Sequence, residues 1–243
     1  MLTAFYDRFK YLMNIEPNES NESKIREEIN ILLVQLHVFF DKQQFESTTA
    51  LHEIERACHN RLRLLQNRLI CKSEGGCAYV CDLHEICENI CFACDLALNS
   101  VGKRVIFDAE DGDVLFTCYP HIVTIIVLNM ISNACIHTSA ENIFVAVRQT
   151  DSGAVVKTSS EGTVNFNSLS ESLNKTGSGV AAMLNGARLH NATIMWGNTV
   201  TSASCAVCFP FGEINADYYT PPDFTELLCD RLSPVYTGLC GII

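Results

Sequence analysis

Two consecutive stretches with the hydrophobic spacing of an α-helix place the strongest constraint on how this chain folds. Apolar residues recur at steps of three and four in residues 24–44 and again in residues 47–71. This spacing predicts two amphipathic helices that pack as an antiparallel hairpin. Because a lone hairpin buries little apolar surface, we expect a homodimer in which two hairpins form a four-helix bundle. The apolar positions are Ile25, Ile29, Leu32, Leu33, Leu36 and Phe40, then Leu51, Ile54, Cys58, Leu62, Leu65 and Leu69.

Beyond a break at Ser73-Glu74-Gly75-Gly76, helical and strand patterns alternate. This order predicts an α+β sandwich, with helices stacked on one face of a mixed sheet. Helices are expected over residues 83–100, 121–137 and 180–190. Strands are expected near residues 103–108, in a further stretch just beyond a turn at Asp111-Gly112, and near residues 143–148, 154–158, 193–197 and 204–210. The predicted domains are an N-terminal segment (1–22), a dimerisation hairpin (23–75), an α/β domain (76–212) and a C-terminal appendage (213–243). The sequence predicts no function for the appendage.

Net charge and hydropathy limit the classes of partner and the cellular compartment that we expect for this protein. A net charge of -11 opposes binding to nucleic acid, which relies on a basic face. The longest nearly uninterrupted apolar stretch, residues 122–131, is about half of the roughly 20 residues that a membrane span needs, and residues 1–10 lack a signal-peptide core. We therefore expect a cytoplasmic protein without a membrane span, whose 13 cysteines are reduced thiols.

Cys87, Cys91 and Cys94 raise the alternative of a metal site. Their spacing of four and three places them along one stripe of a helix, and cysteine is among the most commonly buried residue types. The pair Cys91 and Cys94 has no second pair or nearby histidine at zinc-site spacing. We predict a core-facing stripe and no structural metal.

The segment Asn129-Met130-Ile131-Ser132-Asn133-Ala134-Cys135-Ile136-His137-Thr138 resembles the N box of histidine kinases, N-L-L-x-N-A-x-K-x-T. In that family the second asparagine offers its side-chain carbonyl to Mg²⁺, a cation that prefers oxygen ligands. By position that residue is Asn133, and His137 lies near the place of the phosphate-facing lysine. Taken alone, two asparagines on a helix would merely cap it or pair locally.

A second motif follows at the separation expected in that family. Thr176-Gly177-Ser178-Gly179-Val180 and the later Leu189-His190-Asn191-Ala192-Thr193-Ile194 are similar to the G2 box and to L-H-G-G-x-I. Such glycines let backbone N–H groups approach phosphates at a helix N-terminus. The resemblance covers residues 47–211 and implies the GHKL-type ATPase fold of bacterial two-component sensor histidine kinases. It implies nucleotide contacts at Asn129, Asn133, His137, Glu161, Gly162, Thr176, Gly177 and Gly179, with Mg²⁺ at Asn133 if ATP binds.

The sequence departs from the family at two sites that matter for catalysis. The phosphoacceptor motif H-E-L-R-T-P-L-N falls on residues 23–30, where Ser23 replaces the histidine and Lys24 the acid. Without the imidazole, this position has no group that can accept the phosphoryl. The G1 box, D-x-G-x-G, corresponds to residues 155–164, which hold one glycine and no aspartate; Glu161 is the only substitute there. The lid between residues 164 and 175 is also short.

His52, followed by Glu53, is the alternative phosphoacceptor, and His59 is a weaker one because no acid follows it. Spacing argues against His52, since a second hairpin helix does not fit between residues 73 and 82.

Three hypotheses follow. The first is a degenerate histidine kinase that dimerises and binds a response regulator or a sensor kinase, with weak or absent binding of Mg-ATP. The second is an active ATP-dependent histidine kinase that uses His52. The third is a phosphotransferase of the sporulation type that uses His52 without ATP.

Overall fold

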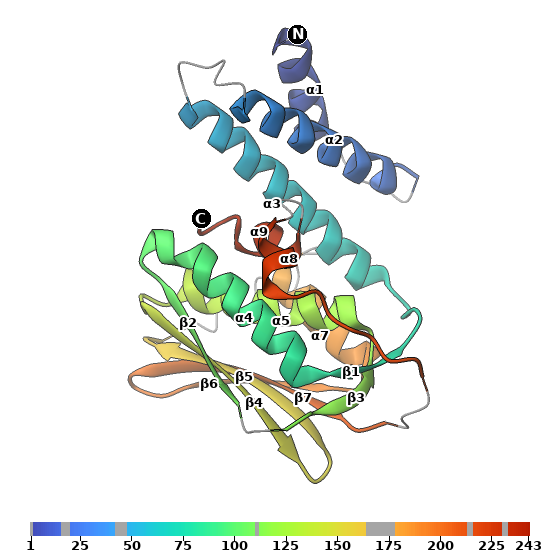
Figure 1. The fold of residues 1–243 in the computed structure, drawn as a ribbon, viewed down its shortest axis with the longest axis vertical. Helices are drawn as coiled ribbons and strands as arrows, with labels where there is room; N and C mark the ends of the chain where they lie inside the picture. Colours follow the sequence, from blue (N-terminus) through green and yellow to red (C-terminus); the bar gives the residue numbers. More distant parts are fainter. Residues whose placement is uncertain are drawn as a thin grey trace. The chain divides into compact units, whose positions relative to one another are not determined.

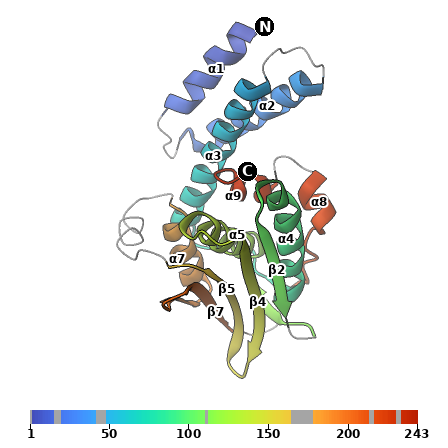
Figure 2. The ribbon, with the colours of Figure 1, turned by 90° about the vertical axis from the view of Figure 1, so that its left-hand side faces the viewer.

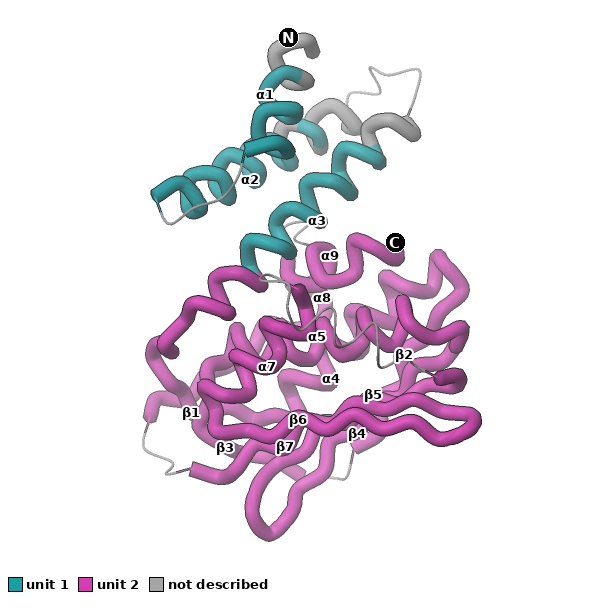
Figure 3. Tube along the Cα trace, turned by 180° about the vertical axis from the view of Figure 1, so that it is seen from behind, with its two compact units in different colours: residues 1–66 teal, residues 67–243 magenta. Residues whose placement is uncertain are grey.

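The computed structural model describes residues 2–15, 20–41, 48–109, 112–163, 178–212, 216–229 and 233–243 (Figure 1). The chain divides into two compact units, residues 1–66 and residues 67–243 (Figure 3). The division falls inside the second predicted helix, upstream of the glycine break from which the sequence predicts a boundary.

Unit 1 is helical. It contains α1 (Leu2–Asn14), α2 (Glu22–Asp41) and the first part of α3 (Thr48–Lys72). Helices α2 and α3 are the two predicted amphipathic helices. Helix α1 contacts α2, and the Arg61 guanidinium of α3 donates to the carbonyl of Ile15. The side chains of Phe40 and Leu51 lie outside those described. The buried apolar positions are Leu12, Ile25, Ile29, Leu32, Leu33, Leu36, Ile54, Cys58, Leu62 and Leu65.

Unit 2 is built on a five-stranded mixed sheet with the order β2-β4-β5-β7-β6. Strands β2 and β4 are parallel, and the other neighbours are antiparallel. The strands are β2 (Arg104–Ala109), β4 (Asn142–Thr150), β5 (Gly153–Glu161), β6 (Thr193–Asn198) and β7 (Ser202–Pro210), and a separate pair joins β1 (Tyr79–Asp82) to β3 (Leu115–Cys118). Burial alternates along β4 and β5, so one face of the sheet lies in the core.

Three long helices cover that face: α4 (Leu83–Leu98), α5 (Pro120–His137) and α7 (Gly179–Leu189) (Figures 1 and 2). A short 3-10 helix, η1 (Asn99–Val101), follows α4. Local capping explains where two of the long helices start. The Asp82 carboxylate accepts from the backbone N–H of His84 at 3.0 Å, and the Ser178 hydroxyl accepts from that of Ala181 at 3.1 Å.

Helix α5 has apolar residues on every side, and most of them are packed against other elements, although Ile136 near its end is exposed. Gly186 lets α7 approach closely, since a Cβ there would lie 2.8 Å from Ile122 Cγ2. Gly238 does the same for α9 (Pro234–Leu239), where a Cβ would lie 3.2 Å from Leu128 Cβ. Among the described residues, α5 alone has the length and composition of a membrane-crossing helix, and 61% of it is buried inside the protein, as in the core helix of a soluble protein.

The C-terminal segment contains α8 (Phe224–Cys229) and α9 (Pro234–Leu239), which contact α4 and α5. Residues 217–219 of this segment run beside β1. The Val80 N–H donates to the Asp217 carbonyl at 2.9 Å, and the Tyr219 N–H donates to the Val80 carbonyl at 2.9 Å. Leu227, Val235 and Leu239 belong to the hydrophobic core. The described part of this segment, predicted only as an appendage, is therefore continuous with the core of unit 2.

The cysteine stripe of α4 lies in the same core. Cys87, Cys91 and Cys94 are buried, and all 13 cysteines, each of them in the described part of the chain, are free thiols. Burial raises the pKa of the Cys91 thiol well above its ordinary value, which keeps this thiol protonated. Across the described ranges no three His, Cys, Asp or Glu side chains are grouped so as to hold a metal ion.

Candidate functional site

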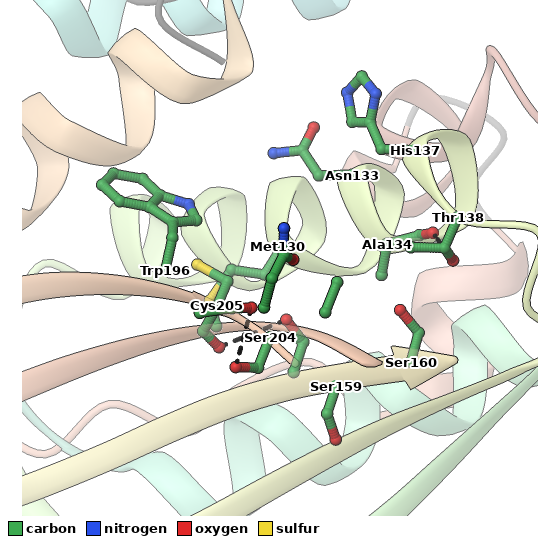
Figure 4. A pocket seen from close by; sticks show the side chains of 14 residues that line it. Met130, Asn133, Ala134, His137, Thr138, Ser159, Ser160, Trp196, Ser204 and Cys205 are labelled. Carbon is green, nitrogen blue, oxygen red and sulfur yellow. Dashed lines mark hydrogen bonds between the residues drawn. The ribbon is translucent and has the colours of Figure 1, made fainter. Parts of the chain in front are cut away.

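A cavity of about 50 Å³ lies in unit 2 between the second half of α5 and the inner face of the sheet (Figure 4). Helix α5 supplies one wall, and strands β5, β6 and β7 supply the other. The lining residues are Met130, Asn133, Ala134, His137 and Thr138, then Thr158, Ser159 and Ser160, then Trp196, Gly197 and Asn198, then Ala203, Ser204 and Cys205.

The helical wall has two kinds of side chain. Met130 and Ala134 point from α5 toward the strands, whereas Asn133 and His137 lie on another side of the helix (Figure 4). Asn133 and His137 are one turn apart and therefore share a face. The Asn133 amide nitrogen lies 3.7 Å from the Met183 sulfur on α7.

The sheet wall is rich in hydroxyl groups. Thr158 and Ser160 are buried, and the Thr158 hydroxyl donates to the Cys205 carbonyl at 3.5 Å. Burial raises the pKa of the Cys205 thiol to about 12, so it is neutral. The Trp196 indole closes one end of the cavity (Figure 4). No lining residue in the described part of the chain is Asp, Glu, Lys or Arg, so the wall offers dipoles and apolar surface.

Asn129, the first asparagine of the N-box-like segment, does not line this cavity. Its amide donates to the Asn67 side-chain carbonyl at 3.3 Å, and the two side chains are only 3% and 2% exposed. Nearby, the Asn185 amide of α7 donates to the Ile70 carbonyl. The last turns of α3 are thus held against α5 and α7 by hydrogen bonds from both.

The other predicted nucleotide-binding residues are spread apart. Glu161 is exposed at the end of β5 and, like Gly162, is not part of the cavity lining. Gly162 has a φ of 98°, a left-handed conformation that favours glycine. Gly179 is the first residue of α7. Thr176 and Gly177 lie outside the described residues, as does the predicted lid.

The predicted phosphoacceptor residues lie on α3 in unit 1. The His52 side chain is 63% exposed, and its Nδ1 lies 3.5 Å from the Glu55 carboxylate. Glu53, the predicted acidic partner, is exposed. The imidazole is therefore paired with the acid three residues on, across one helical turn. On α2, Ser23 and Lys24 are both exposed.

No protein-family model matches the sequence, and no curated protein matches it. Solved structures do match. Full-length ShkA in complex with AMPPNP aligns over 91% of this chain and 46% of its own, with a TM-score of 0.53 and 12% sequence identity. The chain has the fold of a sensor histidine kinase core.

Two further structures with the histidine-kinase fold also match. The histidine kinase AdeS of Acinetobacter baumannii aligns over 87% of this chain and 95% of its own, with 12% identity and a TM-score of 0.47. The ATP-binding domain of PrrB from Mycobacterium tuberculosis aligns over 51% and 96%, with 18% identity and a TM-score of 0.42. The predicted fold class, a helical hairpin followed by an α/β sandwich of this type, is confirmed.

Within the histidine-kinase fold, the structure brings Asn133 and His137 to one cavity with residues that the motifs do not identify. Trp196, Thr158 and Ser160 are the main additions. The alternation of apolar and polar residues along β5 could have identified Thr158 and Ser160, because it places both on the buried face of the sheet with Val156. No sequence pattern around Asn67 indicates its role, because its hydrogen-bond partner Asn129 lies on another helix.

Proposed function

We propose that this chain is a degenerate, kinase-like protein of two-component signalling in the cytoplasm. It dimerises through its N-terminal helices and acts by binding a response regulator or a sensor kinase, and it binds Mg-ATP weakly or not at all. The fold supports the coarser part of this proposal, a histidine-kinase-like protein.

The observation that carries the proposal of weak or absent nucleotide binding is the hydrogen bond between the buried side chains of Asn129 and Asn67. A buried amide pair is costly to separate, because each polar group left alone loses about 1–3 kcal/mol. Asn129 is therefore withheld from a nucleotide, while Asn133 approaches Met183. The cavity lining points the same way, since none of its described residues is a Lys or Arg that could meet the phosphates of ATP. The described residues fit Mg-ATP poorly.

Exposed apolar residues of unit 1 support dimerisation. Most of the two predicted stripes is already buried in the single chain. Tyr11, Ile31, Val34 and Leu64 remain exposed, and Ile31 and Val34 are neighbours on α2. We infer that the dimer contact uses these outer positions of the helices.

Calorimetric titration with the Mg complex of AMPPNP tests the nucleotide part. We expect no heat below millimolar concentration from the wild type, from Asn133→Ala, or from the matched control Asn142→Ala on β4. Micromolar binding that Asn133→Ala abolishes and Asn142→Ala retains would contradict the proposal and favour an active kinase.

One observation favours a second candidate, the ATP-independent phosphotransferase. His52 is exposed, and the Glu55 carboxylate is placed to hold a proton on Nδ1 while Nε2 attacks. The phosphoryl group would leave an aspartyl phosphate of a regulator. The P–O bond breaks, a P–N bond forms on Nε2, and the aspartate departs as a carboxylate.

Transfer from a response regulator labelled by acetyl phosphate tests this candidate. If it holds, an acid-labile phosphoryl group appears on the wild type and on His59→Gln, and is lost in His52→Gln. Equal labelling of all three proteins, or of none, would reject it.

A further inference from the structure

Three large apolar side chains gather on the outer surface of α4 and α8 in unit 2. Phe92 is 51% exposed, Leu96 54% and Phe224 37%. The Phe92 and Phe224 rings lie 5.8 Å apart between centroids, and Leu96 follows Phe92 by one helical turn. We call these three residues the α4–α8 patch. Single exposed apolar residues need no explanation, but a contiguous group that includes two touching rings is typical of an interaction site.

The two helices that carry the patch have one sign of charge. Helix α4 contains Glu85, Glu88 and Asp95, α8 contains Glu226, and neither helix contains Lys or Arg. Glu88 precedes Phe92 by one turn and therefore lies on the same face. Arg104, on β2, is held by a two-point ion pair with Asp95, at 2.7 and 3.0 Å.

The segment that completes the patch is fixed in place and is itself acidic. The Asp223 carboxylate accepts from the Glu226 N–H at 2.8 Å, and the Glu226 carboxylate accepts from the Asp223 N–H at 3.1 Å. This reciprocal capping box starts α8 and orients Phe224. The Tyr218 hydroxyl donates to Glu85 at 3.3 Å. The patch is therefore preformed rather than a frayed end.

We propose that the α4–α8 patch docks a basic, amphipathic segment of a partner protein. Its apolar residues would cover Phe92, Leu96 and Phe224, and its Lys or Arg side chains would meet Glu88 and Glu226. Arginine suits the site doubly, because guanidinium groups also stack on aromatic rings. Charge argues against the other occupants: a second copy would oppose carboxylates to carboxylates, and nucleic acid or an anionic membrane would be repelled. This inference does not depend on the cavity or on His52.

Fluorescence polarisation with a synthetic peptide tests the inference on the full chain. The probe is a labelled helical peptide of about 18 residues, five turns, with a leucine stripe flanked by arginines. One control peptide replaces the arginines by glutamate, and another replaces the leucines by serine. We expect only the first to bind at physiological salt.

Matched variants separate the patch from the overall negative charge. Phe92→Ser and Glu88→Lys should each weaken binding about tenfold, as expected for the centre of an interface. Phe144→Ser, on the exposed face of the sheet, and Asp151→Lys, in the β4–β5 turn, should leave affinity within about twofold. Circular dichroism should be unchanged, because Phe92 is half exposed. Absent binding, equal binding of the glutamate peptide, or equal losses in patch and control variants would overturn the inference.

Discussion

Deletion of residues 213–243 is expected to leave unit 2 unfolded or aggregated. The segment brings Leu227, Val235 and Leu239 into the core. Burying such a side chain stabilises the fold by about 1.5–3 kcal/mol, so the three together are worth roughly 5–9 kcal/mol. That sum is comparable with the entire stability of a typical domain, about 5–15 kcal/mol. Deletion would also uncover Leu128 of α5, against which Gly238 packs. Soluble yield and thermal unfolding of a chain ending at Gly212 measure the effect.

Point variants test the same contribution to stability without removing a whole segment. Leu239→Ala should cost about 2–5 kcal/mol in the free energy of unfolding. Val200→Ala is the matched control, because Val200 is 93% exposed, and it should be nearly neutral. A truncated chain that unfolds at the wild-type temperature would show that the segment is an appendage after all.

Replacement of Phe209 by alanine is expected to lower the free energy of unfolding by about 3–5 kcal/mol. Phe209 is a fully buried residue of β7. Its ring lies 5.3 Å from the Phe116 ring and 5.5 Å from the His190 ring between centroids. The substitution opens a cavity where β3, β7 and the end of α7 meet. Urea unfolding of the variant, beside Cys208→Ala on the same strand, measures the cost; a loss no larger than that of Cys208→Ala would contradict the prediction.

The same substitution is expected to change how stability depends on pH. Burial lowers the pKa of His190 below its ordinary 6.5, while the hydrogen bond to the Gly186 carbonyl at 2.7 Å opposes this shift. The other ring nitrogen accepts from the Tyr119 N–H at 3.0 Å, which requires neutral imidazole. Because the unfolded chain takes up this proton first, the contribution of His190 is complete above pH 6.5 and is lost as the pH falls below it.

In Phe209→Ala, water reaches the His190 ring, so its pKa should rise toward 6.5. NMR titration of the ring protons measures this shift directly, with the exposed His52 of unit 1 as an internal reference. A His190 pKa that is the same in both proteins would show that Phe209 does not shield the imidazole.

Local patterns were sufficient for most of the long helices and strands of this protein. Helix α5, expected over residues 121–137, is Pro120–His137, and β6, expected over residues 193–197, is Thr193–Asn198. Apolar periodicity and capping are properties of neighbouring residues, so they can be identified without knowing the fold. The short β1 was missed because it has only four residues and depends on pairing with β3.

The candidate site was only partly accessible to the same reasoning. The N-box-like spacing placed Asn133 and His137 together, and both line the cavity. Asn129 carries the same motif signal, yet its amide is bonded to Asn67, 62 residues earlier in the chain. A motif specifies residue types at positions along one helix, but it does not specify which other helix packs against them.

The sequence by itself predicted most of the helices and strands, the histidine-kinase-like order of the elements and the pairing of Asn133 with His137 on one helix, because each depends on residues close together in the chain. Only the tertiary structure decided that α9 packs on α5, that Trp196 and Thr158 enclose the cavity, and that Phe92 and Phe224 meet on the surface. These arrangements depend on contacts between distant segments, whose formation is governed by the packing of the whole unit.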